Sequence, residues 1–291
     1  LTPQHTVEIV DLCIYPNTIP TKVIKMDYAA LQPSYIQEFD VVILLAGYSS
    51  IAAGANSNSS GVIENNYFNF VTLLDKLSPT QKFIYASSAG VYDGLEETAV
   101  TETALLKPAS NLYTLTKKNI DEYIRVFNPK FEWYSLRMGT VNGFAEHVRS
   151  DIMINMMFKN AKETGAIKVM SPENRRPILF IEDFSDAVQA IIESSDDNRG
   201  IYNLVSFNSR VIDNANAVVK VTGAKIDIVT PEEYSRMMGS PIPKTLDFSI
   251  SSEKFEETFD FQFHEDPIFI VDDLNTNYDK IKVFSARNPG F

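Results

Sequence analysis

Cysteine and histidine are scarce in this sequence. Cys13 is the single cysteine, so no disulfide can form within the chain, and we expect a reducing compartment. The three histidines, His5, His147 and His264, are scattered along the chain. They form no zinc-ligand spacing with the one cysteine and no credible histidine-based triad. The sequence therefore predicts no metal site.

Positive charge and long apolar runs are also in short supply. Lys and Arg number 26 against 38 Asp and Glu, which gives a net charge of −12. A surface this acidic repels phosphate backbones and anionic lipids. The apolar run at 41–47 is far shorter than the roughly 20 residues needed to span a bilayer, and the first residues lack the pattern of a signal peptide. We expect a cytoplasmic protein without nucleic-acid or membrane partners.

The chain does contain a regular alternation of two kinds of segment. Its 291 residues are 44% apolar and 22% charged, as in ordinary globular proteins. Short runs rich in β-branched and aromatic residues predict strands at 7–12, 22–26, 40–46, 82–87 and 131–137, followed by shorter ones at 201–205 and 225–229. Apolar residues at helical spacing predict helices at 65–77, 111–127, 151–163 and 183–194. This order predicts an α/β fold with a doubly wound parallel sheet, whose ligands bind at the carboxyl ends of the strands.

One predicted helix has a tyrosine and a lysine on its apolar stripe. The stripe has spacings of 4, 3, 4 and 3, and its members are Tyr113, Lys117, Ile120, Ile124 and Phe127. Burying an unpartnered ammonium is costly, so the stripe should open into a cleft near its start, or the helix should bend away there. A cation can lower the pKa of a phenol from about 10, which makes this an acid/base pair. The alternative is a surface tyrosine with a lysine that reaches into solvent.

A buried strand ends at Ser87 and Ser88, 25 residues before Tyr113. Ser-Ser-x-x-Val-Tyr followed by Tyr-x-x-x-Lys resembles the extended short-chain dehydrogenase/reductase family, in particular its NAD-dependent epimerase/dehydratase group, which acts on nucleotide sugars. The resemblance continues in order along nearly the whole chain, through the segments 7–12, 40–47, 135–143, 176–188 and 249–261.

This resemblance implies roles for individual residues. The implied catalytic residues are Ser88, Tyr113 and Lys117. The implied NAD contacts are Asp11, Asp27, Ala46, Gly47, Asn66 (as the opening residue of its helix), Ser87, Tyr113 and Lys117. The implied substrate contacts are Ser88, Asn155, Arg149 and Arg176. An acid such as Asp11 at the end of the second family strand favours NAD over NADP, because it repels a 2′-phosphate.

Several of these residues have structural alternatives. Asp11 could end its strand in an Asx-turn, and Ser88 could cap a strand end. Arg176 could pair with an acidic neighbour, either Glu173 or Glu182. The aromatic residues around Tyr67, Phe68 and Phe70 are expected to pack within a helix rather than stack on a base. We expect Asp183 to be the N-cap of the helix at 184–194 and not a catalytic acid.

The sequence departs from the family at its start. The family begins with a strand and a Gly-x-x-Gly-x-x-Gly turn that receives the pyrophosphate, whereas no glycine here precedes Gly47. Either a first βα unit of roughly 30 residues lies ahead of Leu1, or the cradle is lacking and the cofactor binds weakly or not at all. The first alternative is favoured, and it predicts a central strand between the strands beginning near 22 and 40.

Other departures from the family pattern narrow the set of reactions that we expect. Ala89 and Gly90 stand where family dehydratases have acids, so elimination of water lacks its proton donor and base. Asn69 and Phe70 replace the common Gly-Thr, so packing must differ there. Leu246 replaces a second phosphate-binding arginine, which leaves other cations for a diphosphate: Arg176, and Arg149 or Lys244.

We therefore predict an NAD-dependent nucleotide-sugar epimerase that works by transient oxidation at a carbinol carbon. The alternatives are a keto-sugar reductase with net cofactor turnover and a noncatalytic protein that retains the fold. Residues 1–140 should form the dinucleotide-binding domain, and 141–291 mainly a substrate lobe, with 176–205 returning to the sheet. The resemblance also implies a homodimer formed through the tyrosine-bearing helix and the helix before it.

Overall fold

The computed structural model describes residues 4–13, 21–48, 59–95, 97–238 and 247–285. Its centre is a parallel sheet of four strands in the order β10–β5–β4–β3. The strands are β3 (Val41–Leu44), β4 (Lys82–Ser88), β5 (Glu132–Met138) and β10 (Gly200–Leu204). β4 and β5 are nearly all buried, as expected of parallel strands covered on both faces.

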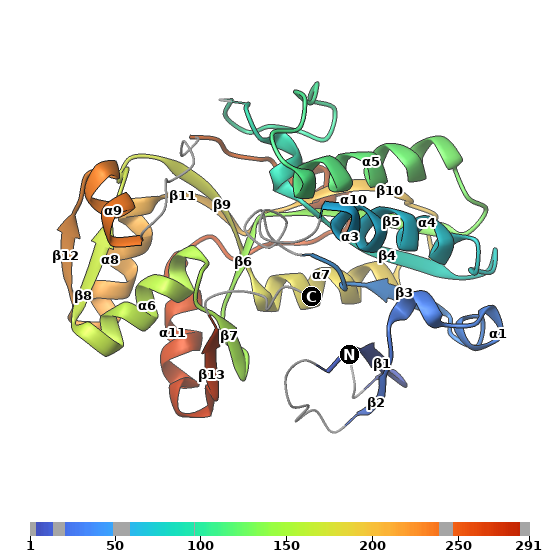
Figure 1. Cartoon of the computed structure of the whole chain (residues 1–291), viewed down its shortest axis with the longest axis horizontal. Coiled ribbons are helices and arrows are strands. Elements are labelled where there is room, and N and C mark those ends of the chain that lie inside the picture. The colour runs from blue at the N-terminus through green and yellow to red at the C-terminus, as the bar shows by residue number, and fades with distance from the viewer. Residues whose placement is uncertain (1–3, 14–20, 49–58, 96, 239–246, 286–291) are drawn as a thin grey trace.

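Helices cover both faces of this sheet, as Figure 1 shows. On one face lie α3 (Ser59–Ile63), the π-helical turn η2 (Glu64–Phe68), α4 (Asn69–Leu74) and α5 (Leu112–Phe127); on the other lie α7 (Ile181–Glu193) and α10 (Glu253–Phe259). Successive side chains of β4 alternate between the two layers: Phe83 and Tyr85 pack with α4 and α5, and Ile84 packs with α7. The predicted doubly wound α/β fold is confirmed.

The two N-terminal strands are separate from this sheet. β1 (Glu8–Asp11) and β2 (Lys22–Lys25) form their own parallel pair, and η1 (Tyr28–Ala30) and α1 (Pro33–Ile36) lead from it to β3. A cavity of about 1010 Å³, lined by both β1 and β3, lies between the pair and the sheet. The expected neighbours of the predicted central strand, the strands beginning near 22 and 40, are therefore wrong, because β1 and β3 line the cavity. The strand that faces β3 across the cavity is β1, because β2 pairs on the far side of β1.

The C-terminal part forms a smaller lobe with three short sheets. β9 (Arg175–Phe180) lies between β6 (Thr140–Asn142) and β11 (Phe207–Arg210). β8 (Ala166–Val169) pairs with β12 (Lys225–Ile228), and β7 (His147–Arg149) pairs with β13 (Val283–Ser285). The helices of this lobe are α6 (Met153–Thr164), α8 (Val211–Thr222), α9 (Pro231–Met238) and α11 (Pro267–Thr276). Residues 176–205 were expected to return to the main sheet. Within this range β10 lies in the main sheet, whereas β9 belongs to the lobe.

Asp183 does not cap α7. The helix begins at Ile181 with Phe180 at the N-cap position, so Asp183 lies inside its first turn. Its buried carboxylate accepts hydrogen bonds from the Ser206 hydroxyl and from His264, whose Nδ1 is 2.6 Å away. The expected N-cap is wrong, because Asp183 instead ties the C-terminal segment to the start of α7.

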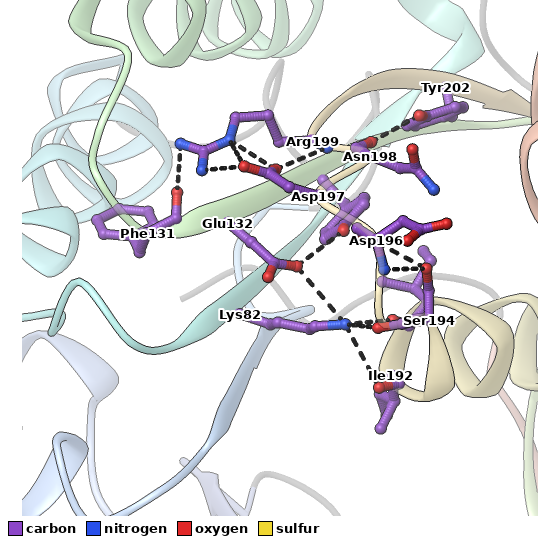
Figure 2. A network of polar contacts seen from close by, with 12 residues as sticks. Lys82, Phe131, Glu132, Ile192, Ser194, Asp196, Asp197, Asn198, Arg199 and Tyr202 are labelled. Atoms are coloured by element: carbon purple, nitrogen blue, oxygen red, sulfur yellow. Dashed lines mark hydrogen bonds and ion pairs between the residues drawn. The ribbon is translucent and has the colours of Figure 1, made fainter.

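A polar cluster fastens the other end of α7 (Figure 2). The ammonium of Lys82, the first residue of β4, donates to the carbonyl oxygens of Ile191 at 3.0 Å and Ser194 at 2.5 Å. Arg199 donates to the Phe131 carbonyl at 3.1 Å and pairs with Asp197. A cation near the last carbonyl groups of a helix is stabilising. This cluster lies at the amino ends of β4 and β5, so the carboxyl ends remain available for a site.

Candidate active site

β4 ends in two serines with different surroundings. Ser88 Oγ accepts a hydrogen bond from the Gly90 amide at 3.0 Å and so caps the short helix η3 (Ala89–Tyr92). Ser87 is buried, and its hydroxyl has no hydrogen-bond partner among the described residues. Ser88 therefore does cap the strand end, as the structural alternative expected, and it also meets the tyrosine described next.

The first turn of α5 brings Tyr113 to Ser88. The Asn111 side chain accepts a hydrogen bond from the Thr114 amide at 2.9 Å, which starts the helix just before Tyr113. The Ser88 side chain lies next to the Tyr113 phenol and interacts with it. A Cβ atom at Gly90 would lie 3.2 Å from Ser88 Oγ and 3.7 Å from Tyr113 Cε1, so bare backbone faces this pair.

Lys117 lies one helical turn beyond Tyr113 and is buried. Its ammonium donates to the Tyr85 hydroxyl and to the Ala86 carbonyl, both at 2.7 Å, and it lies 5.8 Å from the centre of the Tyr113 ring. A lysine reaching into solvent is therefore excluded. The apolar stripe continues through Ile120 and Ile124 but stops before Phe127, which is 44% exposed.

Burial dominates the protonation equilibria of this pair. It raises the pKa of Tyr113, against the opposing effects of the Ser88 hydrogen bond and the positive charge of Arg149. It lowers the pKa of Lys117 to about 8, against the opposing effect of the Asp121 carboxylate. The expected effect of Lys117 on the Tyr113 pKa stays a prediction; Arg149 is the cation that lowers this pKa here, and burial outweighs its effect.

The two acids expected to contact a cofactor both lie near the ends of the N-terminal strands. Asp11, the last residue of β1, accepts a hydrogen bond from the Cys13 amide at 2.6 Å, so the Asx-turn is present. Asp27 follows β2 and caps η1 by accepting from the Ala29 amide at 2.9 Å. Neither bond uses every oxygen lone pair of its carboxylate, so both groups retain acceptor capacity.

Asn66 fastens the loop after β3 to α5. It lies within η2, in the interior of the helical segment, so the expectation that it opens the helix is wrong. Its side chain accepts from the Tyr48 amide at 2.8 Å and donates to Thr116 Oγ1 at 3.3 Å. Gly47 has φ +136°, and a Cβ there would lie 2.8 Å from Asn66 Oδ1. Only glycine fits this close approach, and Ala46 beside it is exposed.

Ser88, at the end of β4, is one of the four expected substrate residues; the other three lie in the lobe, and two of these carry charge. Arg149 pairs with Asp151 through two hydrogen bonds of 3.0 and 2.8 Å, and its charge acts on Tyr113. Arg176 is half-buried, and its charge interacts with Asp247 and Asp93.

Glu173 and Asn155 make contacts other than those expected from the sequence. Glu173, one expected partner of Arg176, pairs with Arg210 instead. The third substrate candidate, Asn155, is buried and accepts from the Gly143 amide at 3.1 Å, which holds the lobe together. Lys244 and Leu246 lie outside the described residues.

A second group of polar residues next to the site was not predicted. Asp121, one turn beyond Lys117, accepts from Ser135 Oγ at 2.6 Å and from Arg137 Nε at 2.8 Å. Arg137 also donates to the Tyr92 hydroxyl at 2.8 Å, which donates to Asn203 Oδ1 at 2.7 Å. We call these five residues the inner network. The i, i+4 spacing from Lys117 to Asp121 was the available signal in the sequence.

Some kinds of site are absent from the described part of the chain. No group of three or more His, Cys, Asp or Glu side chains there could hold a metal ion. None of its helices has the length and apolarity needed to cross a bilayer.

Comparison with known proteins identifies the family. A family model described as NAD dependent epimerase/dehydratase matches residues 16–204. The chain belongs to this family. No curated protein matches it significantly in sequence.

Solved structures share this family fold at low sequence identity. A UDP-glucose 4-epimerase from Stenotrophomonas maltophila, with bound NAD and formylated UDP-arabinopyranose, has a TM-score of 0.79 at 16% identity, over 94% of this chain and 90% of that chain. A UDP-glucuronic acid 4-epimerase from Bacillus cereus, with UDP-glucuronic acid and NAD, has 0.74 at 21%, over 90% and 82%. An NAD-dependent NDP-hexosamine 5,6-dehydratase involved in tunicamycin biosynthesis has 0.78 at 16%, over 96% and 93%.

Proposed function

We propose that this family member is an NAD-dependent epimerase of a nucleotide sugar. The observation that carries the proposal is the contact between Ser88 and Tyr113 at the carboxyl end of β4, with Lys117 one turn away. The similar structures of UDP-sugar 4-epimerases, solved with NAD, support it. We assign dinucleotide binding to residues 1–140 and substrate binding mainly to 141–291.

The residues at the strand ends fit NAD. The Ser87 hydroxyl is buried without a partner among the described residues, so a polar group of a ligand can satisfy it. Lys117 would hold the nicotinamide ribose, and Asp11 and Asp27 would accept hydrogen bonds at the adenosine end. Bound NAD would supply the acceptor and donor of the hydride.

In the proposed reaction, Tyr113 takes the proton from a sugar hydroxyl while the carbon loses hydride; it would act through the minor phenolate form, since burial raises its pKa in the free protein. Ser88 donates a hydrogen bond to the reacting oxygen and steadies it as it becomes a carbonyl. The keto sugar then turns over, receives hydride on its other face, and recovers the proton from Tyr113. Arg149 favours the phenolate by its charge.

Residues Ala89 and Gly90 favour epimerisation over dehydration. Elimination of water needs an acid and a base beside the tyrosine, and a methyl group and bare backbone supply neither. We assign Arg149 and Arg176 to bind the diphosphate of the substrate. We assign Asn155 as a further substrate contact.

The test of this proposal replaces Tyr113 by phenylalanine. The protein is mixed with NAD and either UDP-glucose or UDP-glucuronic acid, and formation of the 4-epimer is followed by NMR. Tyr113→Phe should lower turnover by about a hundredfold or more, with NAD affinity retained, because a positioned acid/base contributes about that much.

A matched control is Tyr134→Phe, which changes a buried tyrosine on the opposite face of the sheet and should keep its turnover. Unchanged turnover in Tyr113→Phe would refute the assignment. Stoichiometric accumulation of NADH or consumption of NADH would favour an oxidoreductase, and no NAD binding at all would favour the noncatalytic alternative.

We also propose that the protein forms a homodimer through α5 and η2. Large apolar side chains are exposed on these two helices: Phe68 (58%), Leu115 (38%), Val126 (69%) and Phe127. Exposed large apolar side chains that gather on one face of a protein are typical of an interaction site. Val126→Asp should shift the mass measured by light scattering towards the monomer, and Ile228→Asp, on β12 of the lobe, should not. A monomeric wild-type protein would contradict this proposal.

A further inference from the structure

Tyr85 is a buried tyrosine beside the site to which the proposed mechanism gives no task. It precedes Ser87 by two residues on β4, so the two side chains lie on the same face of the sheet. Its hydroxyl accepts the 2.7 Å hydrogen bond from Lys117, whose ammonium also lies 4.5 Å from the centre of the Tyr85 ring. Lys117 thus contacts both polar and aromatic parts of Tyr85.

Phe70 holds the Tyr85 ring in place. The two rings meet edge to face with centres 4.9 Å apart, and Phe70 is fully buried in α4. Phe70 is one of the two residues that replace the Gly-Thr common in the family, a departure for which the proposed function gives no reason. An aromatic pair of this geometry restricts where the hydroxyl can point.

We propose that Tyr85 is a positioning residue that keeps the Lys117 side chain in one place whether the lysine is protonated or neutral. A phenol can both accept and donate a hydrogen bond. It accepts from the ammonium, and it can donate to the lone pair of the neutral amine, while an amine N–H still reaches the Ala86 carbonyl. The inference rests on the proposed function only in assigning Lys117 a cofactor to hold.

The surroundings of Lys117 make both protonation states relevant. Burial lowers its pKa to about 8, and the carboxylate of Asp121, on the same helix, opposes this. The other titratable groups that face it are Tyr113 from α5 and Tyr85 from β4. Burial raises the pKa of both phenols, so they stay neutral in the range where Lys117 titrates. An aliphatic neighbour in place of Tyr85 would bond to neither form of the lysine.

The test measures the titration of Lys117 directly, without substrate or cofactor. The full chain is labelled with ¹³C at lysine Cε, and the Lys117 signal is assigned by its loss in Lys117→Met. A charge-assisted hydrogen bond is about twice as strong as a neutral one. Tyr85→Phe should therefore lower the titration midpoint by about one pH unit, and Tyr134→Phe should leave it unchanged. NAD affinity should fall about two- to tenfold in Tyr85→Phe only.

A midpoint that does not move in folded Tyr85→Phe would overturn the inference. If Tyr85→Phe does not fold, Phe70→Leu decides, because it keeps the hydroxyl but removes the ring that holds it, and a smaller shift in the same direction is expected. A shifted midpoint in a protein that binds no NAD would uphold the inference and refute the proposed function. NAD binding with an unshifted midpoint would refute the inference and support the proposed function.

Discussion

The two halves of helix α5 bury charge in opposite ways. In the second half, Asp121 meets the guanidinium of Arg137 at 2.8 Å and the Ser135 hydroxyl, so the inner network compensates its charge fully. In the first half, Lys117 is also buried but hydrogen-bonds only to two neutral oxygens. The Ser87 hydroxyl nearby has no partner within the described residues.

This difference separates the polar residues that stabilise the fold from those that are available to a ligand. A buried charge with complete partners adds rigidity and has nothing left to offer a ligand. A buried cation held by neutral groups, beside an unpaired hydroxyl, is costly to the fold and is typical of functional sites. We therefore propose that the active site lies at the first turns of α5 and that its support lies one turn further on.

The largest expected effect on stability comes from removing the cation that compensates Asp121 in the second half of α5. Arg137→Met leaves the Asp121 carboxylate buried without its cation, which should lower the free energy of unfolding by about 3–5 kcal/mol in urea denaturation. The control is Arg125→Met, on the same helix, which removes an exposed pair with Glu122 and should leave stability close to that of the wild type. Equal effects of the two substitutions would show that the inner network does not support the fold.

The sequence predicted the core of the sheet well because its signal is local. Residues such as Phe83 and Ile84 are apolar in an unbroken run, and that run predicts a strand covered on both faces. The same signal in β1 and β3 did not reveal that the two strands lie on either side of a cavity. Strand pairing depends on contacts between distant segments, which a run of apolar residues does not encode.

The candidate site was predicted from spacing and resemblance, and the inner network was not. Tyr113 and Lys117 share a stripe, and Ser88 is the last residue of a strand, so topology brings them together. Asp121 bonds to Arg137 on β5, and nothing in the spacing of these two residues distinguishes a buried pair from two surface charges. For the same reason, the sequence suggested Asp183 as a cap and missed its contact with His264.

The second expected effect is smaller than the first. It concerns Lys117, in the first half of α5, and the dependence of the unfolding free energy on pH. Between pH 8 and 10.5 the unfolded chain keeps the proton of Lys117 while the folded protein has released it, so stability contributed by this group rises with pH. Relative to Lys117→Met, the unfolding free energy of the wild type should increase by about 3 kcal/mol across this window and stay constant from pH 6 to 7. Subtracting the variant removes the contributions of other groups that titrate in the same range. A difference that does not change between pH 8 and 10.5 would mean that Lys117 is solvated in the folded protein. The two halves of α5 would then not differ in how they bury charge.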